Sequence, residues 1–96
     1  MDKLAQEDID QKLSAFPDWS LIGESMQRTF SFENFVDAMS FVNRVADLAE
    51  DFQHHPDILI RYNKVTLTLS THDAGGLTDK DFAFAREADG YVERTS

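Results

Sequence analysis

The sequence predicts an α+β domain with the element order α-β-β-α-β-β-α: one four-stranded antiparallel sheet with three helices packed on one face. Three observations predict it. Apolar residues recur at helical spacing in three separate segments, and strand-like segments lie in pairs between them. Proline, glycine and asparagine stand at the breaks. We expect residues 1–96 to form a single domain, because this length is near the modal domain size.

The composition excludes several classes of function. Hydrophobic residues make up 42% of the chain, with eight Phe, which indicates a packed core rather than disorder. The absence of cysteine excludes disulfides, thiolate metal sites and a thiol nucleophile. A formal net charge of −9 without a local Lys/Arg cluster argues against direct DNA or RNA binding. No apolar run has the length of a signal peptide or membrane span, so we expect a cytoplasmic protein without membrane contact.

The first helix is predicted over residues 6–15. Its apolar residues Ile9, Leu13 and Phe16 recur at helical spacing. Pro17 follows at once and ends this helix.

The first two strands are predicted over residues 19–22 and 26–32. The first is a short apolar run that begins at Trp19, and Gly23 starts the connection. In the second strand large residues such as Phe30 alternate with small polar ones, the period of a half-buried strand.

The longest periodic segment predicts an amphipathic helix of roughly five turns, with Ser31 as its cap. Its apolar residues fall at spacings of three and four: Phe35, Met39, Val42, Val45, Ala46, Ala49 and Phe52. Pro56 ends this helix, since proline disfavours helical geometry at the residue before it. We therefore expect His54 and His55 at or just beyond the helix C-terminus.

The remaining elements are two strands and a helix. Residues 58–62 and 64–71 are rich in β-branched and aromatic residues, and their turn is expected to centre on Asn63. The last helix is predicted over residues 78–88, with Gly90 closing it.

The three histidines all lie in the segment that begins at Glu50, which suggests one functional region. His54 and His55 admit three interpretations. Adjacent residues rarely converge on one ion, which disfavours a metal site. They could be helix-terminal histidines that interact with the helix dipole. They could also be general acid/base groups, with His72 as a third partner.

Two carboxylates near the histidines have both a structural and a functional interpretation. Glu50 lies four residues before His54 on the same helix face, either as a surface pair worth a few tenths of a kcal/mol or as the group that fixes the ring. Asp81 stands three residues after Thr78, as in a capping box, and it could equally support catalysis.

Four spaced motifs occur in this part of the chain. They are Glu-x-x-x-His-His-Pro at residues 50–56, Tyr-Asn-x-Val at 62–65, Leu-Ser-Thr-His-Asp at 69–73 and Gly-Leu-Thr-x-x-Asp at 76–81. In this order they resemble the motifs of the pterin-4a-carbinolamine dehydratase family. Trp19 and the Phe-x-Phe at residues 30–32 extend the resemblance over nearly the whole chain. His-His-Pro alone would be a weak signal, whereas four motifs in order are specific.

The resemblance implies a lyase that dehydrates 4a-hydroxytetrahydropterin to the quinonoid dihydropterin. It implies a metal-free reaction, so no cofactor is expected. It also implies a homodimer or homotetramer, and a functional link to an aromatic amino-acid hydroxylase whose pterin cofactor is recycled.

The resemblance also implies roles for residues at matching positions. The catalytic imidazoles would be those of His54, His55 and His72. The substrate-binding residues would be Gln53, His54, His55, Ser70, Thr71, His72 and Asp73, and the supporting carboxylates Glu50 and Asp81. One departure concerns Ile58, because many members carry an aromatic residue two positions after the proline.

The chemistry of this reaction suits histidine. Loss of water requires a proton delivered to the hydroxyl at C4a and a proton removed from N5, and imidazoles with an ordinary pKa of about 6.5 can do both at neutral pH. Two alternatives remain. The same fold could act on another pterin, as in molybdenum-cofactor metabolism, or serve as a non-catalytic dimerisation or coactivator module for a transcription factor.

Overall fold

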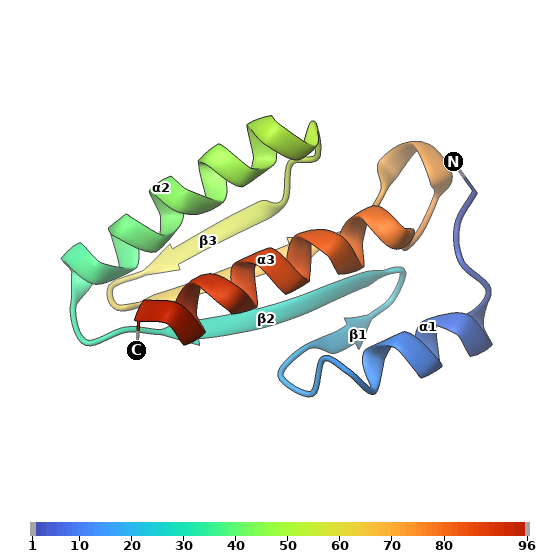
Figure 1. Ribbon diagram of the computed structural model, residues 1–96, viewed down its shortest axis with the longest axis horizontal. Helices are drawn as coiled ribbons and strands as arrows, with labels where there is room; N and C mark the ends of the chain where they lie inside the picture. Colours follow the sequence, from blue (N-terminus) through green and yellow to red (C-terminus); the bar gives the residue numbers. More distant parts are fainter. Residues whose placement is uncertain (1, 96) are drawn as a thin grey trace.

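The computed structural model describes residues 2–95 and confirms the predicted class and element order. Three α-helices, four strands and one short 3₁₀ helix follow one another along the chain (Figure 1). Their bounds are α1 Gln6–Leu13, β1 Ser20–Ile22, β2 Ser25–Ser31, α2 Phe35–Phe52, β3 Asp57–Arg61, β4 Lys64–Leu69, η1 His72–Ala74 and α3 Asp79–Thr95. Within these residues no helix is long and apolar enough to cross a membrane.

The four strands form one antiparallel sheet in the order β1-β2-β4-β3. Val65 of β4 lies opposite Phe30 of β2 and Ile60 of β3, so these three side chains share the face that the helices cover. The other face carries a polar ladder in which the Thr29 and Thr66 hydroxyls lie 2.7 Å apart. The alternation of apolar and polar residues along β2 and β4 therefore decides which face binds the helices.

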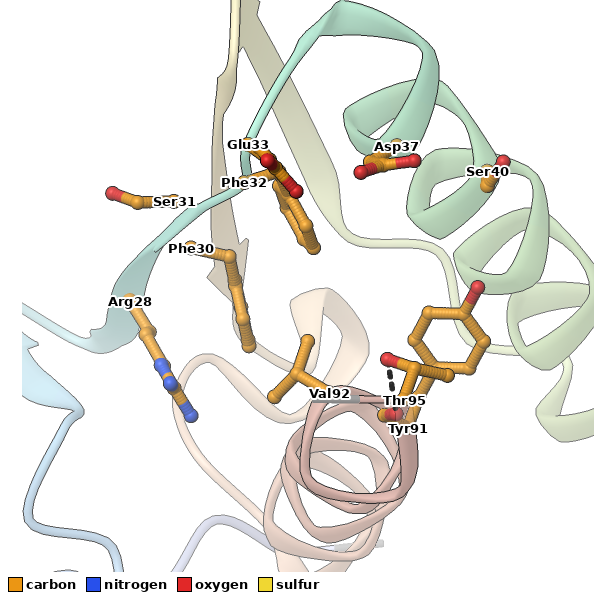
Figure 2. A pocket seen from close by; sticks show the side chains of 10 residues that line it. All are labelled: Arg28, Phe30, Ser31, Phe32, Glu33, Asp37, Ser40, Tyr91, Val92 and Thr95. Atoms are coloured by element: carbon orange, nitrogen blue, oxygen red, sulfur yellow. Dashed lines mark hydrogen bonds between the residues drawn. The ribbon is translucent and has the colours of Figure 1, made fainter.

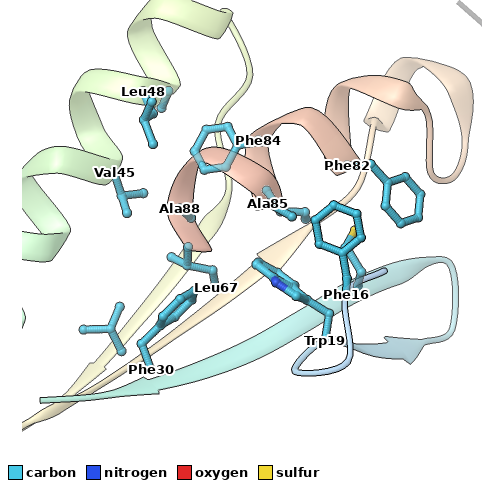
Figure 3. Packing of buried hydrophobic residues seen from close by; sticks show 14 of the residues in the cluster. Phe16, Trp19, Phe30, Val45, Leu48, Leu67, Phe82, Phe84, Ala85 and Ala88 are labelled. Carbon is cyan, nitrogen blue, oxygen red and sulfur yellow. The ribbon is translucent and has the colours of Figure 1, made fainter. Parts of the chain in front are cut away.

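The hydrophobic core fills the space between the sheet and the helices. Figure 3 shows side chains of α2, α3 and the sheet pointing toward one another, among them Val45, Leu48, Phe84, Ala88, Leu67 and Phe30. Phe41 lies at the middle of α2 with no exposed surface. Its ring centroid is 4.6 Å from that of Phe30, 5.2 Å from that of Phe32 and 5.7 Å from that of Tyr91. One aromatic side chain thus joins β2, α2 and α3.

Several element boundaries differ from the prediction. The cap of α2 is Asn34, whose side chain accepts a 2.8 Å hydrogen bond from the Asp37 N–H, whereas Ser31 is still paired in β2 with Lys64. The prediction of Ser31 as the cap was wrong because Ser31 is still the last paired residue of β2. The β3–β4 turn places Tyr62, not Asn63, at positive φ.

The last helix is longer than predicted. It runs through Gly90 to Thr95 instead of ending at Ala88. Gly90 does not have the positive φ of a C-cap glycine. Tyr91 and Val92 pack against the core, and this packing outweighs the low helix propensity of glycine.

The free edges of the sheet are β1 and β3. β2 lies inside the sheet, because it pairs with β1 on one side and with β4 on the other. All five residues of β3 are exposed.

We expect Phe41→Ala to lower the free energy of unfolding by about 3–5 kcal/mol, the usual cost of removing a fully buried Phe. Urea unfolding followed by circular dichroism measures this change. Val36→Ala is the control on the same helix, since Val36 is 71% exposed, and it should change stability by less than about 0.5 kcal/mol. Equal losses in the two variants would contradict the core position of Phe41.

Candidate active site

The end of α2 directs His54 into the protein. Gln53 adopts the left-handed conformation with φ 50° and caps the helix, and its side-chain amide donates a 2.7 Å hydrogen bond to the Glu50 carbonyl. The His54 N–H then bonds the Ala49 carbonyl at 3.0 Å. This change of direction turns the His54 side chain inward, where it is only 9% exposed. Gln53 therefore acts here as a helix cap.

The buried His54 ring bonds a buried carboxylate. Its Nε2 lies 2.5 Å from Oδ1 of Asp81, a residue of the first turn of α3 with no exposed surface. The edge of the same ring packs near Phe84. A buried carboxylate is costly unless hydrogen bonds compensate for the lost water, so Asp81 requires further donors.

These donors come from two threonines. Asp81 Oδ2 accepts a hydrogen bond from the Thr78 N–H at 2.9 Å and another from the Thr71 hydroxyl at 2.8 Å. The hydroxyls of Thr71 and Thr78 are themselves 2.8 Å apart. The Thr78–Asp81 spacing thus forms half of a capping box, while the other carboxylate oxygen remains available to His54.

The second ring nitrogen of His54, Nδ1, stays accessible. Across residues 2–95, no fully buried side-chain nitrogen or oxygen lacks a hydrogen-bond partner. Within the same residues, the one hydrogen bond of the His54 ring is that of Nε2 with Asp81. Nδ1 must therefore be open to solvent or to a ligand.

Glu50 bonds His55 and not His54. Its Oε2 lies 2.7 Å from His55 Nε2, and both side chains are exposed, 73% and 63% respectively. The expected pairing with His54 was wrong because the left-handed Gln53 ends the helix before His54. The helical i, i+4 relation of Glu50 to His54 therefore no longer applies.

His72 follows Thr71, the residue whose hydroxyl bonds Asp81. It begins η1, directly after Thr71, and both His72 and Asp73 are exposed. Thr71 closes this loop, since its N–H donates to the Gly76 carbonyl at 3.0 Å and its carbonyl accepts from the Ala74 N–H. The hydrogen bonds around Asp81 thus include Thr71, the residue directly before His72. The sequence predicted Thr78 as a helix cap and not as a site residue, yet its N–H and its hydroxyl both belong to this network.

The predicted site residues fall into a hydrogen-bonded group and a separate exposed pair. His54, Thr71 and Asp81 are joined by hydrogen bonds, and Ser70 and His72 flank Thr71 in the chain. Glu50 and His55 form a separate exposed pair beside them. Among residues 2–95, no three His, Cys, Asp or Glu side chains are grouped as metal ligands.

A cavity of about 390 Å³ lies elsewhere in the protein. Figure 2 shows its walls, which come from β2, the N-terminal part of α2 and the C-terminal part of α3 and include Arg28, Phe32, Asp37 and Tyr91. His54 follows the opposite end of α2, a helix of 18 residues and hence roughly 27 Å long. None of the predicted site residues lines this cavity.

The fold and the candidate site together define a class of protein. An imidazole held by a buried carboxylate, with two exposed imidazoles nearby and no cysteine in the chain, is typical of enzymes that transfer protons. Comparison with known proteins then gives the family. Residues 2–91 match the family described as pterin 4 alpha carbinolamine dehydratase, and the chain belongs to this family of hydro-lyases, which act on a pterin substrate.

Individual relatives agree with this assignment. A protein of Picosynechococcus sp., provisionally named pterin-4-alpha-carbinolamine dehydratase, is 53% identical over 86% of this chain and 90% of its own length. One of Chloroflexus aurantiacus with the same provisional name is 54% identical over 93% of this chain and 96% of its own. A Brucella melitensis crystal structure described as a transcriptional coactivator/pterin dehydratase has a TM-score of 0.89 and 32% identity, with 93% and 97% of the two chains covered.

One further solved structure shares the fold alone. It is a pterin dehydratase-like protein identified as a RuBisCO assembly factor in the alpha-carboxysome, with a TM-score of 0.62 and 23% identity. The alignment covers 75% of this chain and 83% of that chain.

We expect Asp81→Ala to lower the free energy of unfolding by about 2–4 kcal/mol, because it leaves the His54 ring, the Thr78 N–H and the Thr71 hydroxyl without their acceptor. Urea unfolding measures the change. Glu50→Ala removes the other histidine–carboxylate pair of similar length and is the matched control. Because this pair is exposed, Glu50→Ala should lower the free energy of unfolding by less than about 1 kcal/mol. A larger loss from Glu50→Ala than from Asp81→Ala would contradict this difference.

Proposed function

We propose that this chain dehydrates 4a-hydroxytetrahydropterin to the quinonoid dihydropterin in the cytoplasm by metal-free histidine acid/base catalysis. In this role it recycles the tetrahydropterin cofactor of an aromatic amino-acid hydroxylase. Family membership supports the substrate class. The observation that carries the mechanism is the buried bond between His54 and Asp81, which leaves Nδ1 as the working nitrogen of that ring.

The reaction needs two proton transfers and no change of oxidation state. One group removes the proton from N5, and the electron pair forms the C4a=N5 double bond as the C4a–O bond breaks. A second group protonates the departing hydroxyl, which leaves as water. Atoms and charge balance without a metal or a redox partner. Two imidazoles suffice, one as base and one as acid, and proton exchange with water restores both after each turnover.

His54 and His72 are assigned to these two transfers. His54 is fixed by Asp81, so its accessible nitrogen has a defined position. His72 is exposed on a loop that Thr71 holds to the same carboxylate. General acid/base groups must lie within hydrogen-bond reach of the atoms they serve, so the proposal requires a flat pterin to bind between the two histidines.

The other predicted residues are assigned to binding. The exposed His55–Glu50 pair can bond polar groups of the pterin. Ser70 and Asp73, which follow β4, are assigned to the polar edge of the ring, whereas the backbone groups of Thr71 are occupied in closing the loop.

The direct test is the rate of carbinolamine dehydration with purified protein and synthetic 4a-hydroxytetrahydropterin. The uncatalysed reaction must be subtracted. We expect acceleration that a strong chelator leaves unchanged. Activity lost to the chelator and restored by zinc would overturn the metal-free mechanism. No acceleration at all would favour the non-catalytic alternative, which the description of the Brucella melitensis relative as a coactivator keeps open.

The physiological pterin requires its own experiment. Addition of the protein to a purified aromatic amino-acid hydroxylase should raise the steady-state yield of product when the tetrahydropterin is limiting and a reductant for the quinonoid form is supplied. Dehydration of the synthetic carbinolamine without a rise in hydroxylase product would favour another pterin substrate.

We expect His54→Ala and His72→Ala each to lower kcat by roughly 10²-fold or more, the loss typical of removing a general acid or base. His55→Ala should act more on KM than on kcat, because its ring is assigned to binding. The loss of kcat in the variant that carries both changes, expressed as an activation free energy, should be smaller than the sum of the two single losses if both histidines serve one step. Steady-state kinetics at saturating pterin measures these effects, and near-full kcat in both single variants would refute the acid/base assignment.

We also propose that the chain forms a homodimer or homotetramer through β3. This edge strand exposes the apolar residues Ile58, Leu59 and Ile60, with Leu59 54% exposed. One edge of β3 pairs with β4, so the backbone groups of the other edge can extend the sheet into a second copy.

Sedimentation velocity at micromolar concentration should show an oligomer for the wild type. Leu59→Lys should shift it toward the monomer, because a charge then lies at the proposed contact. Ile22→Lys is the matched control on the other edge strand, where Ile22 is 53% exposed, and it should leave the oligomer intact. Dissociation by Ile22→Lys alone would move the contact to β1.

A further inference from the structure

We propose that Thr71 is a positioning residue: its hydroxyl, supported by that of Thr78, fixes the Asp81 carboxylate and so determines which nitrogen of His54 faces the substrate. The kinetic part of this inference rests on the function proposed above. The structural part does not, because the ring nitrogen that carries the hydrogen can be measured directly.

The hydrogen bonds around Asp81 can be assigned a single direction. The Thr71 hydroxyl donates its one hydrogen to Asp81 Oδ2, so the hydrogen between the two threonines must belong to Thr78. Thr78 Oγ1 in turn accepts from the Lys80 N–H at 3.3 Å. The chain Lys80 N–H, Thr78 O–H, Thr71 O–H therefore points toward the carboxylate at every step.

This direction determines the state of the His54 ring. Asp81 accepts from Thr71, from the Thr78 N–H and, through Oδ1, from His54. The Nε2 of His54 is then a donor, and a neutral imidazole with its hydrogen on Nε2 has its lone pair on Nδ1. Nδ1 is also the nitrogen that solvent or a ligand can reach.

Burial makes the threonine hydroxyls hard to replace. Thr78 and Asp81 have no exposed surface, so bulk water does not reach them. Loss of the Thr71 hydroxyl removes one of the two donors to Oδ2 and removes the acceptor of the Thr78 hydroxyl. The carboxylate is then held by fewer bonds on the side away from His54, and its orientation toward the ring is less defined.

Thr71 also connects the two halves of the proposed site. Its backbone N–H and carbonyl close the loop from residue 71 to residue 76, which carries His72. Its side chain holds the carboxylate that orients His54. A single residue thus connects the loop that carries His72 to the carboxylate that bonds His54.

The test compares Thr71→Val, which removes the hydroxyl while keeping the branched shape, with Thr71→Ser, which keeps the hydroxyl. Thr66→Val is the matched control, because its hydroxyl makes a 2.7 Å bond to Thr29 on the far face of the sheet. NMR of protein with ¹⁵N-labelled histidine reports which ring nitrogen of His54 carries the hydrogen. We expect hydrogen on Nε2 in the wild type, Thr71→Ser and Thr66→Val, and a mixture of both forms in Thr71→Val.

The kinetic readout separates positioning from binding. Thr71→Val should lower kcat roughly tenfold, the equivalent of one hydrogen bond to a charged group, with little change in KM, and Thr71→Ser should restore it. Hydrogen on Nδ1 in the wild type overturns the proposal even if Thr71→Val does not fold. An unchanged ring state in folded Thr71→Val, or failure of Thr71→Ser to restore it, also overturns it. Absence of dehydratase activity in the wild type would refute the proposed function alone, since the ring state still decides this inference.

Discussion

The hydrogen bond between His54 and the buried Asp81 carboxylate is the constraint on which the second half of the chain depends. It joins His54, the second residue beyond α2, to the first turn of α3 across 27 positions of sequence. Because a buried carboxylate must be compensated by donors, it also determines where Thr71 and Thr78 lie. The loop that follows β4 and the start of α3 are thereby fixed together. The geometry of the site is a consequence of satisfying one buried charge.

The elements of the fold were predictable because their signals are local. The spacing of apolar residues along α2 and their alternation along β2 predict a helix and a strand. The predicted apolar stripe of α2 was only partly right: Val45 and Ala49 are buried, whereas Phe35 is 47% exposed. Phe41 and Leu48, which lie outside that stripe, are buried instead. Boundaries were less predictable because they depend on contacts between elements. Gly90 looks like a helix terminator, yet Tyr91 packs against Phe41 and the helix continues. Packing of this kind cannot be read from a stretch of single sequence.

The site was predictable as a set of residues but not as a set of bonds. The motifs indicated His54, Asp81 and Thr71, and the structure joins them. The helical spacing of Glu50 and His54 predicted a bond that the left-handed Gln53 prevents. A sequence shows that Gln53 precedes two histidines, but a positive φ at a residue other than glycine is uncommon and leaves no clear signal. The pairing of carboxylates with histidines therefore required the structure.

The two histidine–carboxylate pairs show how burial separates roles that the sequence presents as equivalent. The bond between His54 and Asp81 is buried, so both groups have one arrangement before substrate binds. The pair of His55 and Glu50 is exposed, and water competes for each group. A proton-transfer group gains from a fixed position, because misplacement of the reacting atoms is costly in rate. A binding group can tolerate freedom, because the ligand itself orders it. This difference in burial, rather than the identity of the residues, is the physical reason why we assign proton transfer to His54 and not to its neighbour His55. His72 is exposed as well, and its assignment rests on its place beside Thr71.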